Sequence, residues 1–257
     1  MQSQCSNSSL PPRFQNVSEI LNCSVHKSDG LLTVPVGKLN VNFTRSKNNL
    51  AIVQLLKKLH PFVQHVKMDE LKDCLYSGLQ EDGEFRVGAL QMPRGSLLVV
   101  DECGLKEGKL GDVECKNVNA LMEIAMNQKL PFDFSSHAIM IDANYPFLSL
   151  SEGKSLFPMD LHVPLANETF LQEVDDDVIK MCCNYLLSCH FIAFSIGDEM
   201  SLFLQHEFIR LKSAKQMKQE HFEVLLTLAR CLAVCEGKED LDNRIWNESL
   251  ELFYKFQ

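Results

Sequence analysis

The sequence lacks the glycine-rich phosphate loop that most nucleotide hydrolases carry. The pattern G-x-x-x-x-G-K-[ST] occurs nowhere, and the nearest match, Glu152–Ser155, would need its first glycine at Leu148. The backbone amides and lysine of such a loop balance the charge of the phosphates. Because this cradle is absent, an ordinary nucleotide site is excluded, and Gly153-Lys154-Ser155 is interpreted as a turn between strands.

Positive charge is also scarce. The chain has 25 Lys and Arg against 34 Asp and Glu, a formal net charge of −9. Binding to nucleic acid needs a local excess of cations, so this balance argues against a general nucleic-acid binder. Two groups are candidate basic patches, but their spacing is typical of solvated helix faces. They are Lys57, Lys58 and Lys67, and Arg210, Lys212, Lys215 and Lys218.

Paired C-x-x-C motifs are missing, although the chain has ten cysteines. Cys182 and Cys183 are adjacent, Cys231 and Cys235 are four apart on a predicted helix, and no histidine stands at zinc-finger spacing. Adjacent cysteines on a helix point apart and do not pair. The spacing therefore predicts buried free thiols in a reducing compartment and no metal site.

No apolar run approaches the length of a membrane span, and the first residues lack the apolar core of a signal peptide. Triplets of the N-x-[ST] type, such as Asn16–Ser18 and Asn42–Thr44, are therefore interpreted as chance matches. We expect a soluble, intracellular protein with no membrane partner.

The chain does have the composition of a globular protein. It is 46% hydrophobic and 23% charged, and its 257 residues allow one large or two small domains. Residues 1–30 are rich in Ser and Asn and are expected to be loosely ordered.

An α/β pattern follows. The continuous apolar run Ser96–Val100 is typical of a central strand covered on both faces. The pattern also predicts one or two short strands within 31–43, an amphipathic helix at 50–59, and a helix capped by Asn117. Further strands are expected at 129–134, 138–141 and 161–165. Strands that alternate with helices indicate an α/β layer.

From about Val174 the period becomes helical. Residues 178–189 and 246–253 mark two helices, and 222–233 has the most regular apolar stripe in the chain. Ser195 and Asp198 form a capping-box signal for a further helix. The predicted organisation is an α/β core at 31–170 and a helical domain at 171–257.

Several segments, in this order, carry a family resemblance: residues 34–39, 95–102, 108–110, 117–121, 131–135, 151–158, 195–199 and 222–232. Over residues 31–257 the chain resembles the C-terminal part of the MCM-binding proteins, distant relatives of the MCM helicase subunits. The resemblance implies a partial, degenerate AAA+-like α/β core without a phosphate loop, followed by a lid-like helical bundle. Members of the family are longer, with an N-terminal region and core sequence upstream, so a truncated or shortened form is expected.

Gly95–Glu102 is similar to the strand that ends in two carboxylates in nucleotide hydrolases. There the Asp helps to hold Mg²⁺ and the Glu polarises the attacking water. Without a phosphate loop, Asp101 and Glu102 are predicted to be vestigial. The alternative is an acidic pair that caps the following turn or faces solvent. No catalytic residue, cofactor or metal ligand is predicted.

The resemblance also locates two lost cations. An arginine that would serve a neighbouring subunit's site is absent from Leu156–Asp160, and Glu220–Glu223 stands where a helical-domain arginine would reach the γ-phosphate. A carboxylate at that place would repel phosphate. In contrast, Ala143–Pro146 and Leu121–Gln128 keep the family-like pattern.

The resemblance therefore implies a nuclear, non-catalytic protein that binds MCM helicase subunits. Such a protein would regulate assembly of the replicative helicase or its release from chromatin, in DNA replication, the cell cycle and sister chromatid cohesion. Its association with chromatin would be indirect, without sequence-specific binding to nucleic acid. Two alternatives stay open: a divergent ATPase with an unorthodox phosphate site, suggested only by Asp101 and Glu102, and a truncated, non-functional fragment.

Overall fold

A five-stranded parallel sheet lies at the centre of the fold. The computed structural model describes residues 39–44, 49–104, 108–134, 137–165, 174–189, 191–214 and 217–257. The strand order is β2-β5-β8-β1-β9, with every pair parallel. The strands are β1 (Val41–Thr44), β2 (Val63–Lys67), β5 (Leu97–Asp101), β8 (Phe147–Ser151) and β9 (Leu161–Pro164). The predicted α/β class is confirmed.

Both faces of β5 are covered, as its apolar run predicts. Leu97 and Val99 lie in one core with helix α2 (Asn49–Leu59), whereas Leu98 and Val100 lie in a second core with helix α3 (Asp112–Asn127). Burying each such side chain contributes about 1.5–3 kcal/mol relative to leaving it exposed. The strand that ends in Asp101 is therefore fixed from two sides.

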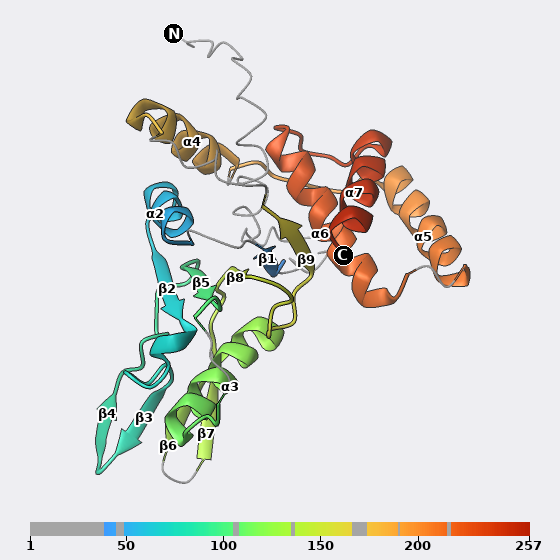
Figure 1. Ribbon diagram of the computed structural model, residues 1–257. Helices are drawn as coiled ribbons and strands as arrows, with labels where there is room; N and C mark the ends of the chain where they lie inside the picture. The colour runs from blue at the N-terminus through green and yellow to red at the C-terminus, as the bar shows by residue number, and fades with distance from the viewer. Residues whose placement is uncertain are drawn as a thin grey trace.

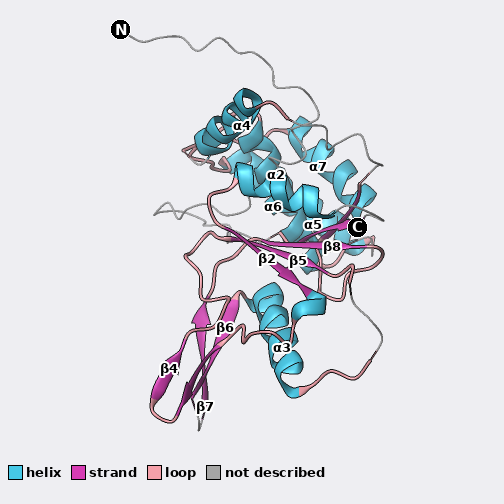
Figure 2. Cartoon of the chain, turned by 60° about the vertical axis from the view of Figure 1, so that its left-hand side comes forward, coloured by secondary structure: helices cyan, strands magenta, loops and turns pink. Residues whose placement is uncertain are grey.

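A second, mixed sheet has the order β4-β3-β6-β7. Its strands are β3 (Gly78–Glu81), β4 (Glu84–Arg86), β6 (Lys129–Phe134) and β7 (His137–Asp142). Asp82 and Gly83 both have positive φ, as a tight hairpin turn between β3 and β4 requires. The strands predicted near 129–134 and 138–141 are confirmed, but they lie in this separate sheet beside α3 rather than in the central layer (Figure 2).

The predicted cap of α3 is wrong. The helix starts at Asp112, and the Glu114 carboxylate accepts a hydrogen bond from the backbone N–H of Gly111. Asn117 lies inside the helix and is fully buried. Its side chain accepts from the N–H of Tyr76 at 2.8 Å and donates to the carbonyls of Leu71 and Cys74. Asn117 therefore satisfies the backbone of a distant loop rather than the start of its own helix.

Four helices follow the central sheet: α4 (Asp176–Cys189), α5 (Asp198–Ser213), α6 (Gln219–Cys235) and α7 (Asn243–Phe256). All four were predicted. However, the capping box expected at Ser195 is wrong, because α5 begins after Gly197 without a side-chain cap, and Ser195 forms an isolated bridge with Asp240. The aromatic ring of Trp246 packs against Phe222, and both are buried.

One continuous core joins the helices to the sheet. It contains residues of α2, β1, β5 and β8 together with residues of α4, α5, α6 and α7. In Figure 1 these helices lie on one side of the parallel sheet, and α3 with the mixed sheet lies on the other.

The domain limits at 170 and 171 stay a prediction, and the segment 1–30, which was predicted to be loosely ordered, lies outside the described residues. In the described part of the chain, no helix combines the length and apolarity that crossing a membrane requires.

Candidate functional site

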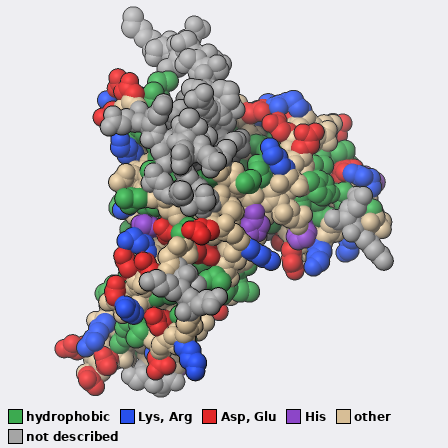
Figure 3. Space-filling model, viewed as in Figure 1, with side chains coloured by type: hydrophobic (Ala, Val, Ile, Leu, Met, Phe, Trp, Pro, Cys, Tyr) green, Lys and Arg blue, Asp and Glu red, His purple; other side chains and the backbone are tan. Residues whose placement is uncertain are grey.

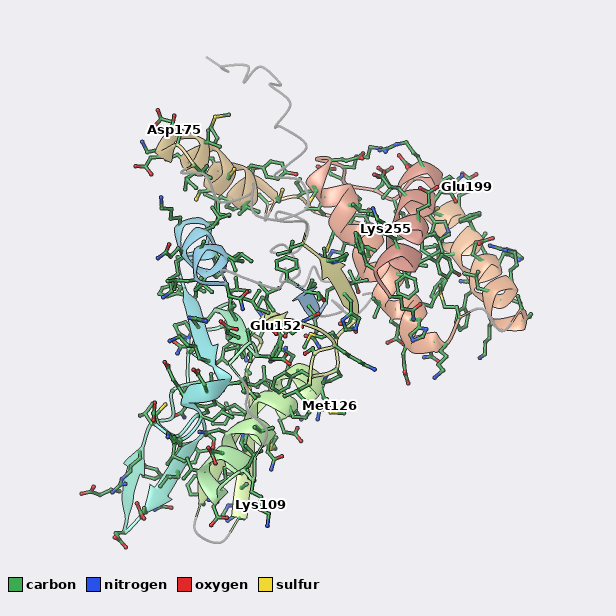
Figure 4. The ribbon with its side chains drawn as sticks, viewed as in Figure 1. Lys109, Met126, Glu152, Asp175, Glu199 and Lys255 are labelled. Atoms are coloured by element: carbon green, nitrogen blue, oxygen red, sulfur yellow. The ribbon has the colours of Figure 1, made fainter. Side chains whose placement is uncertain are left out.

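The acidic strand end lies at the carboxyl edge of the parallel sheet. Because all five strands are parallel, the carboxyl ends of β1, β5 and β8 meet at this edge. β1 lies between β8 and β9, so the order of the strands in the sheet reverses at β1. In open α/β sheets, ligands bind outside the carboxyl ends of the strands at such a reversal. Figure 4 places Glu152, which follows β8, in the central part of the molecule. This edge is therefore the candidate site.

Asp101 caps the turn after β5. Its Oδ1 accepts a hydrogen bond from the backbone N–H of Cys103 at 3.0 Å and another from Asn49 Nδ2 at 2.8 Å. Asn49 is the first residue of α2. In phosphate-binding proteins the start of such a helix faces the ligand's phosphate. Here the side chain at the start of α2 faces a carboxylate, which would repel a phosphate at the same place.

His65 lies on the other side of Asp101. Its Nε2 is 3.7 Å from Asp101 Oδ2 and has no hydrogen-bond partner among the described residues. Burial lowers the pKa of His65, and Lys57 and Lys67 lower it further, while the Asp101 carboxylate opposes both effects. A neutral imidazole is thus favoured at this place.

Glu102 is turned into the protein rather than toward a ligand. It is 9% exposed, and its carboxylate accepts hydrogen bonds from the hydroxyls of Ser149 and Ser155 and from the backbone N–H of Leu156. The Ser155 and Leu156 bonds measure 2.5 and 2.8 Å. Glu102 therefore ties the end of β5 to β8 and to the loop that follows β8.

A buried polar network extends from Glu102 toward β1. Asn42, which is fully buried, donates to the hydroxyls of Ser149 at 3.2 Å and Ser151 at 2.8 Å, and accepts from Thr44. These side chains lie on the face of the sheet away from the apolar residues of β1 and β8 in the first core. Buried polar groups of this kind are stable only when they pair with one another, as they do here.

The sequence between β1 and α2 does not have the pattern of a phosphate cradle. A helix follows a strand here, which is the arrangement that a phosphate loop needs. Only residues 45–48 separate the two elements, and they read Arg-Ser-Lys-Asn, without glycine. The Gly153-Lys154-Ser155 segment lies instead between β8 and β9, as the turn that was predicted. Ser155 is buried against Glu102, so this segment is committed to an internal contact.

The remaining predicted positions lie elsewhere. Asp160 precedes β9, where its Oδ2 accepts from the backbone N–H of Asn40 at 2.6 Å. Burial raises the pKa of Asp160 to about 6. Glu220 and Glu223 are exposed on the first turns of α6. Among the described residues, no hydrogen bond or ion pair joins any of these three carboxylates to Asp101 or Glu102.

Asn42, Asn49, Ser149 and Ser155 are the site residues that sequence reasoning missed. The signal for Ser149 was available, since Phe147–Ser151 places hydroxyls at every second residue, the period of one face of a strand. Among the residues that the structure describes, no group of three or more His, Cys, Asp or Glu could hold a metal ion. The hydrogen bonds of Asp101 and Glu102 hold the sheet to its loops and to helix α2.

The fold and this edge define an α/β protein whose acidic strand end is engaged by its own side chains. The chain belongs to the family described as mini-chromosome maintenance replisome factor, which matches residues 21–255. The family resemblance carried by the sequence segments is thereby confirmed.

Curated relatives come from distant eukaryotes. Proteins named mini-chromosome maintenance complex-binding protein are 29% identical in Arabidopsis thaliana, 26% in Homo sapiens and 29% in Drosophila melanogaster. The alignments cover 85%, 85% and 84% of this chain, but only 40%, 37% and 39% of these relatives. The chain thus spans well under half the length of the relatives that it matches.

Proposed function

We propose that this protein binds subunits of the MCM complex without catalysing a reaction, and so regulates assembly of the replicative helicase or its release from chromatin. It would act in the nucleus, in DNA replication, the cell cycle and sister chromatid cohesion, and reach chromatin through its partners rather than through DNA. Membership of the family and the names of the relatives support the choice of partner.

The observation that carries the non-catalytic part of the proposal is the engagement of Glu102. A residue that polarises an attacking water needs a free carboxylate oxygen directed at the ligand. Both oxygens of Glu102 accept internal hydrogen bonds instead. Asp101, which would hold a metal ion, is bonded to Asn49 and to the turn.

The order of strands supports a degenerate AAA+-like core. Counted along the chain within the parallel sheet, the first strand lies between the fourth and the fifth, and the second lies at the far edge. This is the order of AAA+ modules, in which the core and the helical domain also follow one another. A scaffold of this shape without its phosphate loop is suited to lie where a helicase subunit meets a neighbour, which is the mechanism that we propose.

Capture from nuclear extract tests the binding. Tagged full-length chain should recover MCM subunits, also after nuclease treatment, because the contact is between proteins. Recovery of no MCM subunit would overturn the proposed partner, and recovery that nuclease abolishes would overturn the indirect association with chromatin.

Calorimetry tests the alternative of a divergent ATPase. Titration with ATP and Mg²⁺ should give the same negligible heat for the natural chain and for Asp101→Ala. A binding heat that Asp101→Ala removes would favour an enzyme and contradict the proposal.

A further inference from the structure

Strand β7 forms an open edge of the mixed sheet. Among the described strands it pairs only with β6, and all six of its residues are exposed. Ile139, Met140 and Ile141 are 46%, 40% and 43% exposed, an unusual degree for consecutive large apolar residues. An edge strand presents unpaired N–H and C=O groups to any extended chain that approaches it.

The register shows which groups face outward. The N–H of Ala143 donates to the carbonyl of Gln128 at 2.9 Å, and this pair continues the register of β6 with β7. Hydrogen-bonded pairs alternate along an antiparallel ladder, so every second residue of β7 bonds to β6. The backbone groups of Ala138, Met140 and Asp142 therefore point away from β6.

One face beside this edge is apolar and open. Across the ladder, Ile139 lies opposite Phe132 and His137 lies opposite Phe134. The rings of Phe132 and Phe134 are 4.9 Å apart, and both lie 6.1 Å from the ring of Phe85. On the opposite face, Asp133 pairs with Lys116 of helix α3. Side chains of an added strand would thus lie beside Ile139 and Ile141, which continue the apolar face of the aromatic cluster formed by Phe85, Phe132 and Phe134.

The two edges of the sheet differ in protection. At the other edge, β4 has only three residues, and two of them are charged, Glu84 and Arg86. Short strands and charges are devices that keep an edge from pairing. From Ala138 to Ile141, β7 has no charge and no proline. This edge therefore lacks the usual protection.

The surroundings of β7 are acidic. Residues 78–86 and 109–142, which include the mixed sheet and α3, contain eight Asp or Glu and four Lys or Arg. Figure 3 shows carboxylates at the lower left, around the β3–β4 hairpin, with cations between them. A strand bearing Lys or Arg beside its apolar residues would complement this charge. A second copy would not, because each chain carries a formal net charge of −9.

We infer that the outer edge of β7 binds an extended strand of a partner protein, with apolar side chains at alternate positions and basic residues at its flanks. Main-chain hydrogen bonds to Ala138, Met140 and Asp142 would supply affinity, and the exposed side chains of Ile139 and Ile141 would select the apolar side chains. The identity of the partner rests on the proposed function, in which the strand belongs to a subunit of the MCM complex.

The test uses a labelled peptide, Lys-Lys-Val-Thr-Val-Thr-Val-Lys-Lys, and fluorescence anisotropy with the full chain. Met140→Pro removes one outward N–H while leaving the bonds of Ile139 and Ile141 to β6, and edge strands tolerate proline in this orientation. Met140→Val, which keeps the N–H, is the matched control. We expect binding to weaken about tenfold for Met140→Pro, the scale of one lost hydrogen bond and a blocked register, and less than about threefold for Met140→Val.

Two further peptides separate pairing from charge attraction. The same peptide N-methylated at every valine and threonine keeps its charge but cannot pair through either edge, and should not bind. A version with Glu in place of Lys should bind more weakly. Equal binding of the N-methylated peptide would overturn strand pairing, and equal binding of the Glu peptide would overturn the basic flanks. A concentration-dependent dimer that Met140→Pro dissolves would overturn the choice of a partner over a second copy.

Capture from nuclear extract with Met140→Pro separates this inference from the proposed function. If the natural chain recovers MCM subunits and Met140→Pro recovers them equally, the β7 edge is overturned as the docking surface and the proposed function stands. If the natural chain recovers none but binds the basic peptide, the proposed partner fails and the strand-binding edge stands. Matching circular dichroism spectra of the two Met140 variants would confirm that both are folded.

Discussion

The Ser155 hydroxyl donates to the Glu102 carboxylate at 2.5 Å, across 53 positions of sequence. This bond joins the end of β5 to the loop between β8 and β9. In a nucleotide hydrolase the corresponding Glu would be free to act on water. Here Glu102 is a buried structural carboxylate, because it accepts hydrogen bonds from three donors of its own chain.

Replacing Glu102 should therefore affect stability. In Glu102→Ala, two hydroxyls and one backbone N–H lose their acceptor, and we expect the free energy of unfolding to fall by about 2–4 kcal/mol. Urea denaturation followed by circular dichroism measures this change. Glu152→Ala, at an exposed position next to the same loop, should change it by less than about 0.5 kcal/mol. An unaltered midpoint for Glu102→Ala would contradict a structural role and revive the catalytic one.

Asn117 should be a second anchor of the fold. Asn117→Ala leaves the N–H of Tyr76 and two carbonyls of the loop before it without a partner inside the protein. Unsatisfied buried groups cost about 1–3 kcal/mol each where water cannot reach them, so we expect a loss of about 2–4 kcal/mol. Asn119→Ala, exposed on the same helix, is the control. Equal thermal midpoints for both variants would show that the loop does not depend on Asn117.

Some elements follow from sequence alone because their signals are local. Helices α2 and α6 have apolar residues at helical spacing, and β5 has an uninterrupted apolar run, so their position and type could be predicted. Asn117 shows where local signals mislead. An Asn before an apolar stripe is typical of a helix cap, yet its partners lie 41 to 46 positions upstream, which no local pattern records.

Pairing between strands is the other limit. The segments 129–134 and 138–141 were predicted as strands, but their sheet is completed by β3, whose Leu79 lies opposite Asp133. A β-strand's partner is set by tertiary contacts across a long separation rather than by its own composition. The candidate site depends on such contacts too. The acidic pair was predicted, whereas the donors from β8 and its loop that engage Glu102 were not.

Asp160 should limit stability at neutral pH. Burial raises its pKa from 3.8 to about 6, so the folded state holds the proton more tightly than the unfolded state does. Its contribution to stability therefore decreases as pH rises from about 4 to about 6, and above that range an ionised carboxylate is held at a cost. Asp160→Asn should be more stable than the natural chain by about 1–3 kcal/mol at pH 7.5. The difference should vanish below about pH 4, as urea midpoints at both pH values would show. A variant less stable at pH 7.5 would contradict this.

His65 should give a pH dependence of the opposite sign. Burial lowers its pKa, so between that value and 6.5 the unfolded state binds more protons than the folded state. Stability should consequently fall as pH drops below about 6.5, and His65→Gln should remove this part of the dependence. Asp160 titrates in an overlapping range, but it is present in both proteins, so its effect cancels in the difference between their free energies of unfolding.

Urea denaturation from pH 5 to 8 measures this difference. The stability of His65→Gln relative to the natural chain should increase progressively as pH falls. His206→Gln, on an exposed part of α5, controls for the loss of an imidazole and should leave the slope unchanged. If the difference for His65→Gln stays constant with pH, the imidazole is not held neutral by its surroundings, and the attraction of Asp101 balances the effect of burial.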